Sequence, residues 1–195
     1  MPPVTQTLLI ANVAVFLLQS ASGGVLEEWF ALWPPGHGFA IWQLVTYGFL
    51  HGGIAHIFFN MLGLYMFGSD IERLFGSRYF LAYYFACLIA AALTQLVFTS
   101  IAGGPPFPTL GASGGLYGLL LAFGMYFPRR MVMLIFPPIP MQARFFVILF
   151  GSLELVFGVT GTAAGVAHFA HLGGMLRGWL MIQYRRRGFP FTRGR

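Results

Sequence analysis

Four polar residues of this 195-residue chain are of the right types for acyl transfer: Ser113, His171, His56 and Asn60. A serine attacks a carbonyl only when a base accepts its proton, and a histidine nitrogen within about 2.6–3.2 Å of the hydroxyl can do so. The attack leaves negative charge on the carbonyl oxygen, so donors fixed beside it are needed. His56, Asn60 and the backbone N–H of Ser113 are suitable donors. If these groups converge, they predict a serine hydrolase site.

Their positions along apolar segments predict that they lie at one depth in a membrane. Counted at 1.5 Å per residue from the charged end of its own segment, Ser113 lies roughly 24 Å up, Asn60 roughly 18 Å and His171 roughly 21 Å. A hydrocarbon layer is roughly 30 Å thick, so Ser113 should lie below the far surface. His56 and Asn60 are four residues apart and share one helix face.

Glycines at four-residue spacing predict that two of these segments pack closely. Gly114 and Gly118 follow the serine, and Gly174 and Gly178 follow His171. Such faces let two membrane helices approach closely, which is what a Ser–His contact requires. Tyr117, one turn after Ser113, would lie beside the imidazole and limit its rotation. A serine among glycines also occurs in membrane helices for packing alone, so the histidine and amide partners are what favour chemistry.

Composition decides the class of protein. The chain is 57% hydrophobic and 8% charged, with a mean hydropathy of +0.75, whereas soluble domains carry about 25% charged residues. The net charge of +6 comes from arginines at the ends of apolar segments, which is a topology signal and not a nucleic-acid-binding pattern. The single cysteine, Cys87, excludes an intrachain disulfide and a cysteine metal cluster. No cofactor is expected.

We expect an all-α membrane protein, a bundle of six transmembrane helices in one domain over residues 1–187, with a short basic tail at 188–195. The arginine-rich ends predict that both termini are cytoplasmic and that the site opens to the outer face. The six segments are near Val4–Gln19, Ile54–Ile71, Tyr79–Ser100, Ala112–Phe127, Phe145–Thr160 and Ala163–Tyr184.

No acidic residue is expected at the depth of His171 on the three segments that carry the site, so the sequence predicts a Ser-His dyad. Glu154, in the fifth segment, is the only candidate for an acidic partner, and it is expected to be a neutral or hydrogen-bonded structural carboxyl. His51 and His168 are expected to be loop or interfacial residues. His168-x-x-His171 has metal-ligand spacing, but without a carboxylate or cysteine nearby no metal site is expected.

Motifs over residues 51–178 resemble the rhomboid intramembrane serine proteases of the bacterial, six-helix type. They are Gly111-x-Ser113-Gly114, His56-x-x-x-Asn60, Gly68-x-x-x-Glu72-x-x-x-Gly76 and Ala170-His171-x-x-Gly174-x-x-x-Gly178. The resemblance implies that Ser113 is the nucleophile, that His171 is the general base, and that His56, Asn60 and the Ser113 N–H form the oxyanion site. It also implies that Tyr117 packs on the catalytic ring and that residues 145–166 gate substrate entry. Glu72 is interpreted as structural.

The expected function is therefore an intramembrane endopeptidase that cleaves transmembrane segments of other proteins, in contact with lipid and in a bacterial inner membrane. A catalytically silent relative that only binds membrane segments is the alternative. A transporter or channel is disfavoured because its polar residues should line a path through the whole membrane, and here they gather in the outer half. The oligomeric state and the substrate are not indicated.

Overall fold

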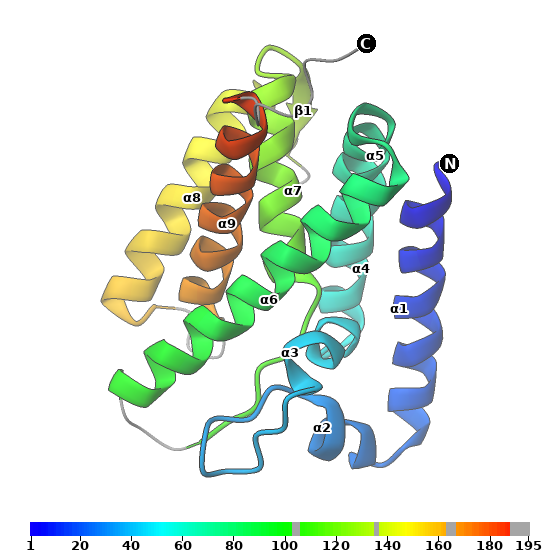
Figure 1. Cartoon of the computed structure of the whole chain (residues 1–195), viewed down its shortest axis with the longest axis vertical. Coiled ribbons are helices and arrows are strands. Elements are labelled where there is room, and N and C mark those ends of the chain that lie inside the picture. Colours follow the sequence, from blue (N-terminus) through cyan, green and yellow to red (C-terminus); the bar gives the residue numbers. More distant parts are fainter. Residues whose placement is uncertain (103–105, 135–136, 163–166, 188–195) are drawn as a thin grey trace.

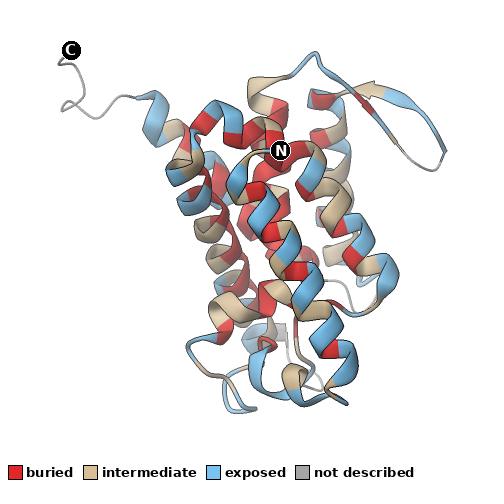
Figure 2. Cartoon of the chain, turned by 90° about the vertical axis from the view of Figure 1, so that its right-hand side faces the viewer, coloured by how far each residue is buried: buried red, intermediate tan, exposed pale blue. Residues whose placement is uncertain are grey.

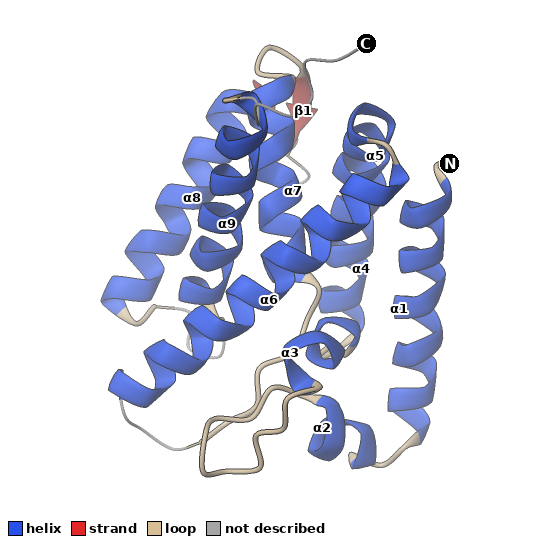
Figure 3. Ribbon diagram, viewed as in Figure 1, coloured by secondary structure: helices blue, strands red, loops and turns tan. Residues whose placement is uncertain are grey.

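A computed structural model describes residues 1–102, 106–134, 137–162 and 167–187 of the chain, and these residues are mainly helical (Figure 1, Figure 3). The first half contains α1 (Pro3–Ala21), α2 (Val25–Phe30), α3 (Gln43–Thr46), the short 3-10 helix η1 (Tyr47–Phe49), α4 (Ile54–Gly63), the π-helical turn η2 (Leu64–Gly68) and α5 (Ser69–Phe75). The second half contains α6 (Ser77–Ala102), α7 (Ser113–Tyr126), the antiparallel strands β1 (Met131–Met133) and β2 (Pro140–Gln142), α8 (Ala143–Thr160) and α9 (His168–Arg186).

Helices occur at all six predicted segments, the second of them continuing from α4 through η2 into α5. Within the described residues, four helices are long and apolar enough to cross a membrane: Pro3–Ala21, Ile54–Phe75, Ser77–Ile101 and Ala143–Thr160. α7 has 14 residues, or about 21 Å, and α9 begins only at His168. The all-α membrane class is therefore established, and six crossings remain a prediction.

The start of α1 and the end of α9 lie at the same end of the bundle (Figure 1). This arrangement is the one expected if both termini face one side of the membrane. That this side is the cytoplasm remains a prediction, as does the extent of the domain. The predicted tail, 188–195, lies outside the described residues.

The core lies around α7, which packs against α6 and α9, while α8 lies at the edge of the bundle (Figure 1). Buried residues lie between the helices, and exposed residues lie on their outward faces (Figure 2). Most of α7 is buried, whereas α8 buries only Ala143, Val147 and Glu154 among its described residues. Large apolar side chains such as Ile148 and Val159 are exposed on α8. Exposed apolar surface of this kind suits lipid contact. Glu154, in contrast, is a charged-type residue buried on the face of α8 that packs against the bundle.

The predicted glycine contact between α7 and α9 is present. A Cβ atom built on Gly174 would lie 2.1 Å from the carbonyl oxygen of Gly114. One built on Gly118 would lie 2.4 Å from Sγ of Cys87 on α6, and one on Gly178 would lie 2.3 Å from the Tyr83 hydroxyl. Only glycine permits this approach, and the approach carries the first turn of α9 to the first turn of α7.

Glu72 joins the beginning of α1 to α5 and α6. Its carboxylate accepts hydrogen bonds from the backbone N–H groups of Val4 (3.0 Å) and Thr5 (2.7 Å), and from the hydroxyls of Thr5 (2.7 Å) and Ser77 (2.7 Å). Unpaired N–H groups and a partial positive charge are found at the start of every helix, and a carboxylate satisfies both. These contacts agree with the structural interpretation of Glu72.

Candidate active site

Ser113 and His171 meet where α7 and α9 begin. The Ser113 Oγ lies 2.7 Å from Nε2 of His171, which is hydrogen-bond distance. Ser113 is the first residue of α7, so its backbone N–H has no acceptor within the helix and is free to bind another group. The hydroxyl, the imidazole and a free N–H thus occupy one place, as the depth count predicts.

Tyr117 holds the imidazole of His171 in a fixed plane. The two rings are stacked with their centroids 4.4 Å apart and an angle of 7° between their planes. Because Tyr117 lies one turn after Ser113 on α7, the helix that carries the nucleophile also orients the base. This is the position expected from the sequence.

His56 lies against the backbone next to the nucleophile. The backbone N–H of Gly52 donates to Nδ1 of His56 at 3.2 Å, so the proton of a neutral ring is on Nε2. A Cβ built on Gly111 would lie 2.8 Å from that Nε2 and 3.7 Å from Ser113 Oγ, and Gly111 has a φ of +126°. Glycine at 111 therefore makes room for the His56 ring and adopts a backbone conformation that other residues rarely adopt. The Nε2–H of His56 therefore lies beside the Ser113 hydroxyl as a hydrogen-bond donor.

Asn60 lies in the same cavity, one turn along α4. Its side-chain amide donates to the backbone carbonyl of His56 at 2.8 Å, and its Oδ1 has no hydrogen-bond partner among the described residues. An amide has two donor hydrogens, so one remains for a second acceptor. Asn60 can therefore serve as a donor here, although no direct contact with Ser113 is present.

A cavity of about 830 Å³ contains these side chains. It is lined by the polar residues Ser113, His171, His56, Asn60, Tyr117 and Glu154 and by many apolar side chains. Phe59 and Met66 line it from α4 and η2, and Phe146 and Phe150 from α8. The cavity therefore lies between the second predicted segment and α8. Of the predicted gate, 145–166, residues 163–166 lie outside the described part of the chain.

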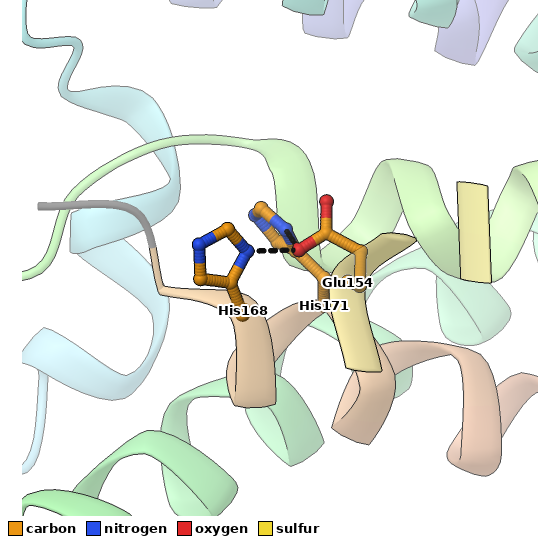
Figure 4. Close-up of side chains that lie close together, drawn as sticks. All are labelled: Glu154, His168 and His171. Carbon is orange, nitrogen blue, oxygen red and sulfur yellow. Dashed lines mark hydrogen bonds and ion pairs between the residues drawn. The ribbon is translucent and has the colours of Figure 1, made fainter. Parts of the chain in front are cut away.

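Glu154 lies within reach of the base, which corrects the prediction that no acid is in range. One carboxylate oxygen, Oε2, lies 2.6 Å from Nδ1 of His168 and 2.9 Å from Nδ1 of His171. Figure 4 shows both imidazoles around this oxygen. The 2.9 Å contact is an ion-pair distance whose direction falls outside ordinary hydrogen-bond geometry. The other oxygen, Oε1, accepts a hydrogen bond from the Tyr117 hydroxyl.

Glu154 is hydrogen-bonded, as the sequence predicts, but its contact with His171 and the burial of His168 differ from the prediction for a physical reason. Glu154 is the only candidate for an acidic partner in the sequence, but nothing in the sequence places it beside His171. Which face α8 turns inward depends on tertiary packing. His168, expected at an interface, is a buried residue of the first turn of α9. A carboxylate in a membrane helix was itself a signal, because such groups are costly and usually functional.

Glu154, His168 and His171 could also hold a metal ion, since their ligand atoms all lie within 4.8 Å of one another. The expectation of no metal assumed that no carboxylate was near, and that assumption is wrong. Ligands around a tetrahedral zinc ion lie about 3.3 Å apart, given bonds of about 2.0–2.1 Å. The distances of 2.6 and 2.9 Å from Oε2 are shorter and match direct hydrogen-bond or ion-pair contact. The spacing therefore favours a proton-sharing cluster.

Comparison with known proteins identifies the family. The Rhomboid domain model matches residues 38–188, well over half of the chain. The chain belongs to the rhomboid family. This rhomboid is 32% identical over 140 residues to "Rhomboid protease GluP" of Bacillus subtilis, a match that covers 71% of this chain and 25% of that protein.

Two further relatives show how widely similar sequences occur. "Rhomboid protein 1, mitochondrial" of Saccharomyces cerevisiae is 32% identical over 150 residues, covering 73% of this rhomboid and 41% of the relative. "Rhomboid protease GlpG" of Photorhabdus laumondii is 28% identical over 188 residues, covering 95% and 62%. The matched part of this rhomboid thus covers between a quarter and about three fifths of the length of these relatives. Its family is confirmed, and its activity and substrates are proposals.

Most of the predicted site residues of this rhomboid lie together. Those gathered where α7 and α9 begin, or holding these helices together, are Ser113, His171, His56, Asn60, Tyr117, Gly111, Gly114, Gly174 and Gly178. Glu72 does not line the cavity and instead bonds to the start of α1. The catalytic roles of these residues remain predictions.

Proposed function

We propose that this rhomboid is an intramembrane serine endopeptidase in which Ser113 is the nucleophile and His171 the general base. The observation that carries the proposal is the 2.7 Å contact between Ser113 Oγ and His171 Nε2 inside a largely apolar helix bundle. A hydroxyl hydrogen-bonded to an imidazole is the arrangement that activates serine for attack. The names of GluP and GlpG as rhomboid proteases add support.

The reaction follows from these contacts. His171 Nε2 takes the Ser113 proton as Oγ bonds to the substrate carbonyl carbon, and then gives that proton to the leaving amine. A water, deprotonated by the same nitrogen, then attacks the acyl-serine carbonyl, and that proton passes to Ser113 Oγ as the ester bond breaks. The Nε2–H of His56, the Ser113 N–H and the free amide hydrogen of Asn60 are donors to the oxyanion, and each such donor is worth about 3–4 kcal/mol in the transition state.

The substrate class follows from the cavity between α4–η2 and α8. Its mostly apolar lining suits a transmembrane segment of another protein that enters from the bilayer. A regular helix hides its carbonyls in backbone hydrogen bonds, so segments that unwind easily should be cleaved best. We expect a multi-pass protein of a bacterial inner membrane, with cytoplasmic termini and a site open to the periplasmic or extracellular side. In this scheme α8 moves to admit the substrate.

Replacing Ser113 with alanine tests the proposal. Cleavage of a fluorogenic transmembrane reporter by the purified protein in lipid nanodiscs should disappear, together with labelling by a fluorophosphonate. Ser152, an exposed serine on α8, provides the matched control, and Ser152→Ala should cleave and be labelled normally. Undiminished cleavage by Ser113→Ala would reject the assignment. A folded wild-type chain that is neither labelled nor active would favour the silent binder of membrane segments.

A further inference from the structure

We propose that Glu154 is a positioning residue that, with His168 as its partner, fixes the tautomer of His171, so that the site works as a Ser-His-Glu triad. This inference rests on the proposed function. It adds a third member, on a third helix, to the Ser113–His171 pair.

Glu154 is surrounded by donors and almost completely buried. Its side chain belongs to a residue only 7% exposed, yet both oxygens are in contact with polar groups. Oε1 accepts from the Tyr117 hydroxyl, and Oε2 faces Nδ1 of His168 and of His171. A carboxylate without partners would be very costly inside a membrane protein, and this one has three. Glu154 therefore connects Tyr117, His168 and His171 in one polar cluster.

His168 supplies a proton to this cluster. Its Nε2 lies 3.1 Å from the backbone carbonyl oxygen of Thr162, which can only accept, so Nε2 carries a hydrogen. Its Nδ1 lies 2.6 Å from Oε2 of Glu154, and a contact that short needs a second proton, on the ring or on the carboxyl. In either form this pair of Glu154 and His168 therefore carries no net charge.

The same oxygen decides which nitrogen of His171 is free. An acceptor 2.9 Å from Nδ1 favours the tautomer with the hydrogen on Nδ1. Nε2 then keeps its lone pair for the Ser113 hydroxyl, as a general base must. When Nε2 takes the proton, the resulting imidazolium has Oε2 beside it. Because the contact is not aligned as a regular hydrogen bond in this state, its main effect is electrostatic.

Glu154 also acts on His171 through a second route. Tyr117, which donates to Oε1, is the ring stacked on His171 at 4.4 Å. One carboxylate thus influences both the protonation of the base and the side chain that fixes its plane. A purely structural role for Glu154 would explain its bond to Tyr117 but not its contact with His171 Nδ1. The experiment must therefore separate the structural role from the effect on protonation.

Glu154→Gln is the variant that separates these roles. Glutamine has the same shape and its oxygen can keep the Tyr117 bond. Its NH₂ group would then face Nδ1 of His171 as a donor and favour the tautomer with hydrogen on Nε2, which cannot accept the serine proton. We expect kcat to fall by about 10²–10⁴-fold, with KM changed less than about threefold, and fluorophosphonate labelling to slow in parallel. Glu72→Gln, which changes the other buried glutamate, is the matched control and should retain kcat in the folded protein.

Nitrogen-15 NMR of the histidine side chains reads the tautomer directly. The His171 signal, assigned by its loss in His171→Asn, should show hydrogen on Nδ1 in the wild type and on Nε2 in Glu154→Gln. Unchanged kcat in Glu154→Gln, or a wild-type His171 with hydrogen on Nε2, would overturn the triad. So would loss of activity on dialysis against a chelator with recovery on adding zinc, because the cluster would then be a metal site.

These outcomes are distinguishable from failure of the proposed function. If Ser113→Ala is inactive while Glu154→Gln is fully active, the triad fails and the protease assignment stands. If the wild-type chain is never labelled or active, the protease assignment fails, and the NMR result still decides the tautomer of His171.

Discussion

Gly174→Ala is the substitution that most directly tests whether close helix approach creates the Ser113–His171 contact. A Cβ at this position would lie 2.1 Å from the carbonyl oxygen of Gly114. Both atoms are fixed to helix backbones, so no side-chain rotation can relieve the overlap. The helices α7 and α9 must separate or rotate.

The size of the separation follows from contact distances. A carbon and a carbonyl oxygen come no closer than about 3.3 Å, so the overlap requires a shift of about 1 Å. Gly174 lies one turn after His171 on α9. Moving α9 outward by that amount would stretch the 2.7 Å contact between His171 Nε2 and Ser113 Oγ beyond about 3.2 Å, the limit for proton transfer. A misplacement of about 1 Å can cost about 10²-fold in rate, and we expect kcat to fall by at least that factor.

The measurement is reporter cleavage in nanodiscs together with thermal unfolding of the same samples. Gly151→Ala on α8 is the control, because a Cβ there would approach only the flexible end of Met175, at 3.3 Å. The control should cleave at close to the wild-type rate. Full activity of Gly174→Ala in protein that unfolds at the wild-type temperature would refute the claim that glycine contact positions the site.

Two further predictions concern stability. Burial, and secondly the charge of neighbouring His56, lowers the pKa of His51 to about 4, and the residue is 1% exposed. The unfolded chain takes up a proton below about pH 6.5 while the folded chain does not, so stability should be full above pH 6.5 and fall toward pH 4, by roughly 3 kcal/mol. Unfolding followed against pH should show this loss, and His51→Leu should remove it; an unchanged acid profile in that variant would contradict the reasoning. Glu72→Gln should lower the unfolding free energy by about 2–4 kcal/mol, because an amide has one acceptor oxygen for four donors. A thermal midpoint equal to that of the wild type would show that these bonds do not hold α1 in place.

Sequence reasoning was most accurate where local spacing controls geometry. Ser113 and Tyr117 are one helical turn apart, so their shared face followed from the helix period alone. The close approach of the two glycine-lined helices also followed, because small residues at four-residue spacing let membrane helices pack closely. Helices at all six predicted segments followed from runs of apolar residues.

It was less accurate where contacts join elements far apart in the chain. Glu154 and Tyr117 are separated by 37 residues, and no periodicity links them. The last predicted segment starts at Ala163, which lies outside the described residues, whereas α9 begins at His168.

The amino-acid sequence alone determined that this is a helical membrane protein and which serine, histidine and glycine residues belong together, because hydropathy and helical spacing are properties of the chain itself. Only the tertiary structure decided that α8 turns Glu154 toward His168 and His171. The reason is physical: the rotation of a lipid-facing helix about its axis is set by the packing of its neighbours. A single buried carboxylate in an apolar helix does not reveal in the sequence which partners it will meet.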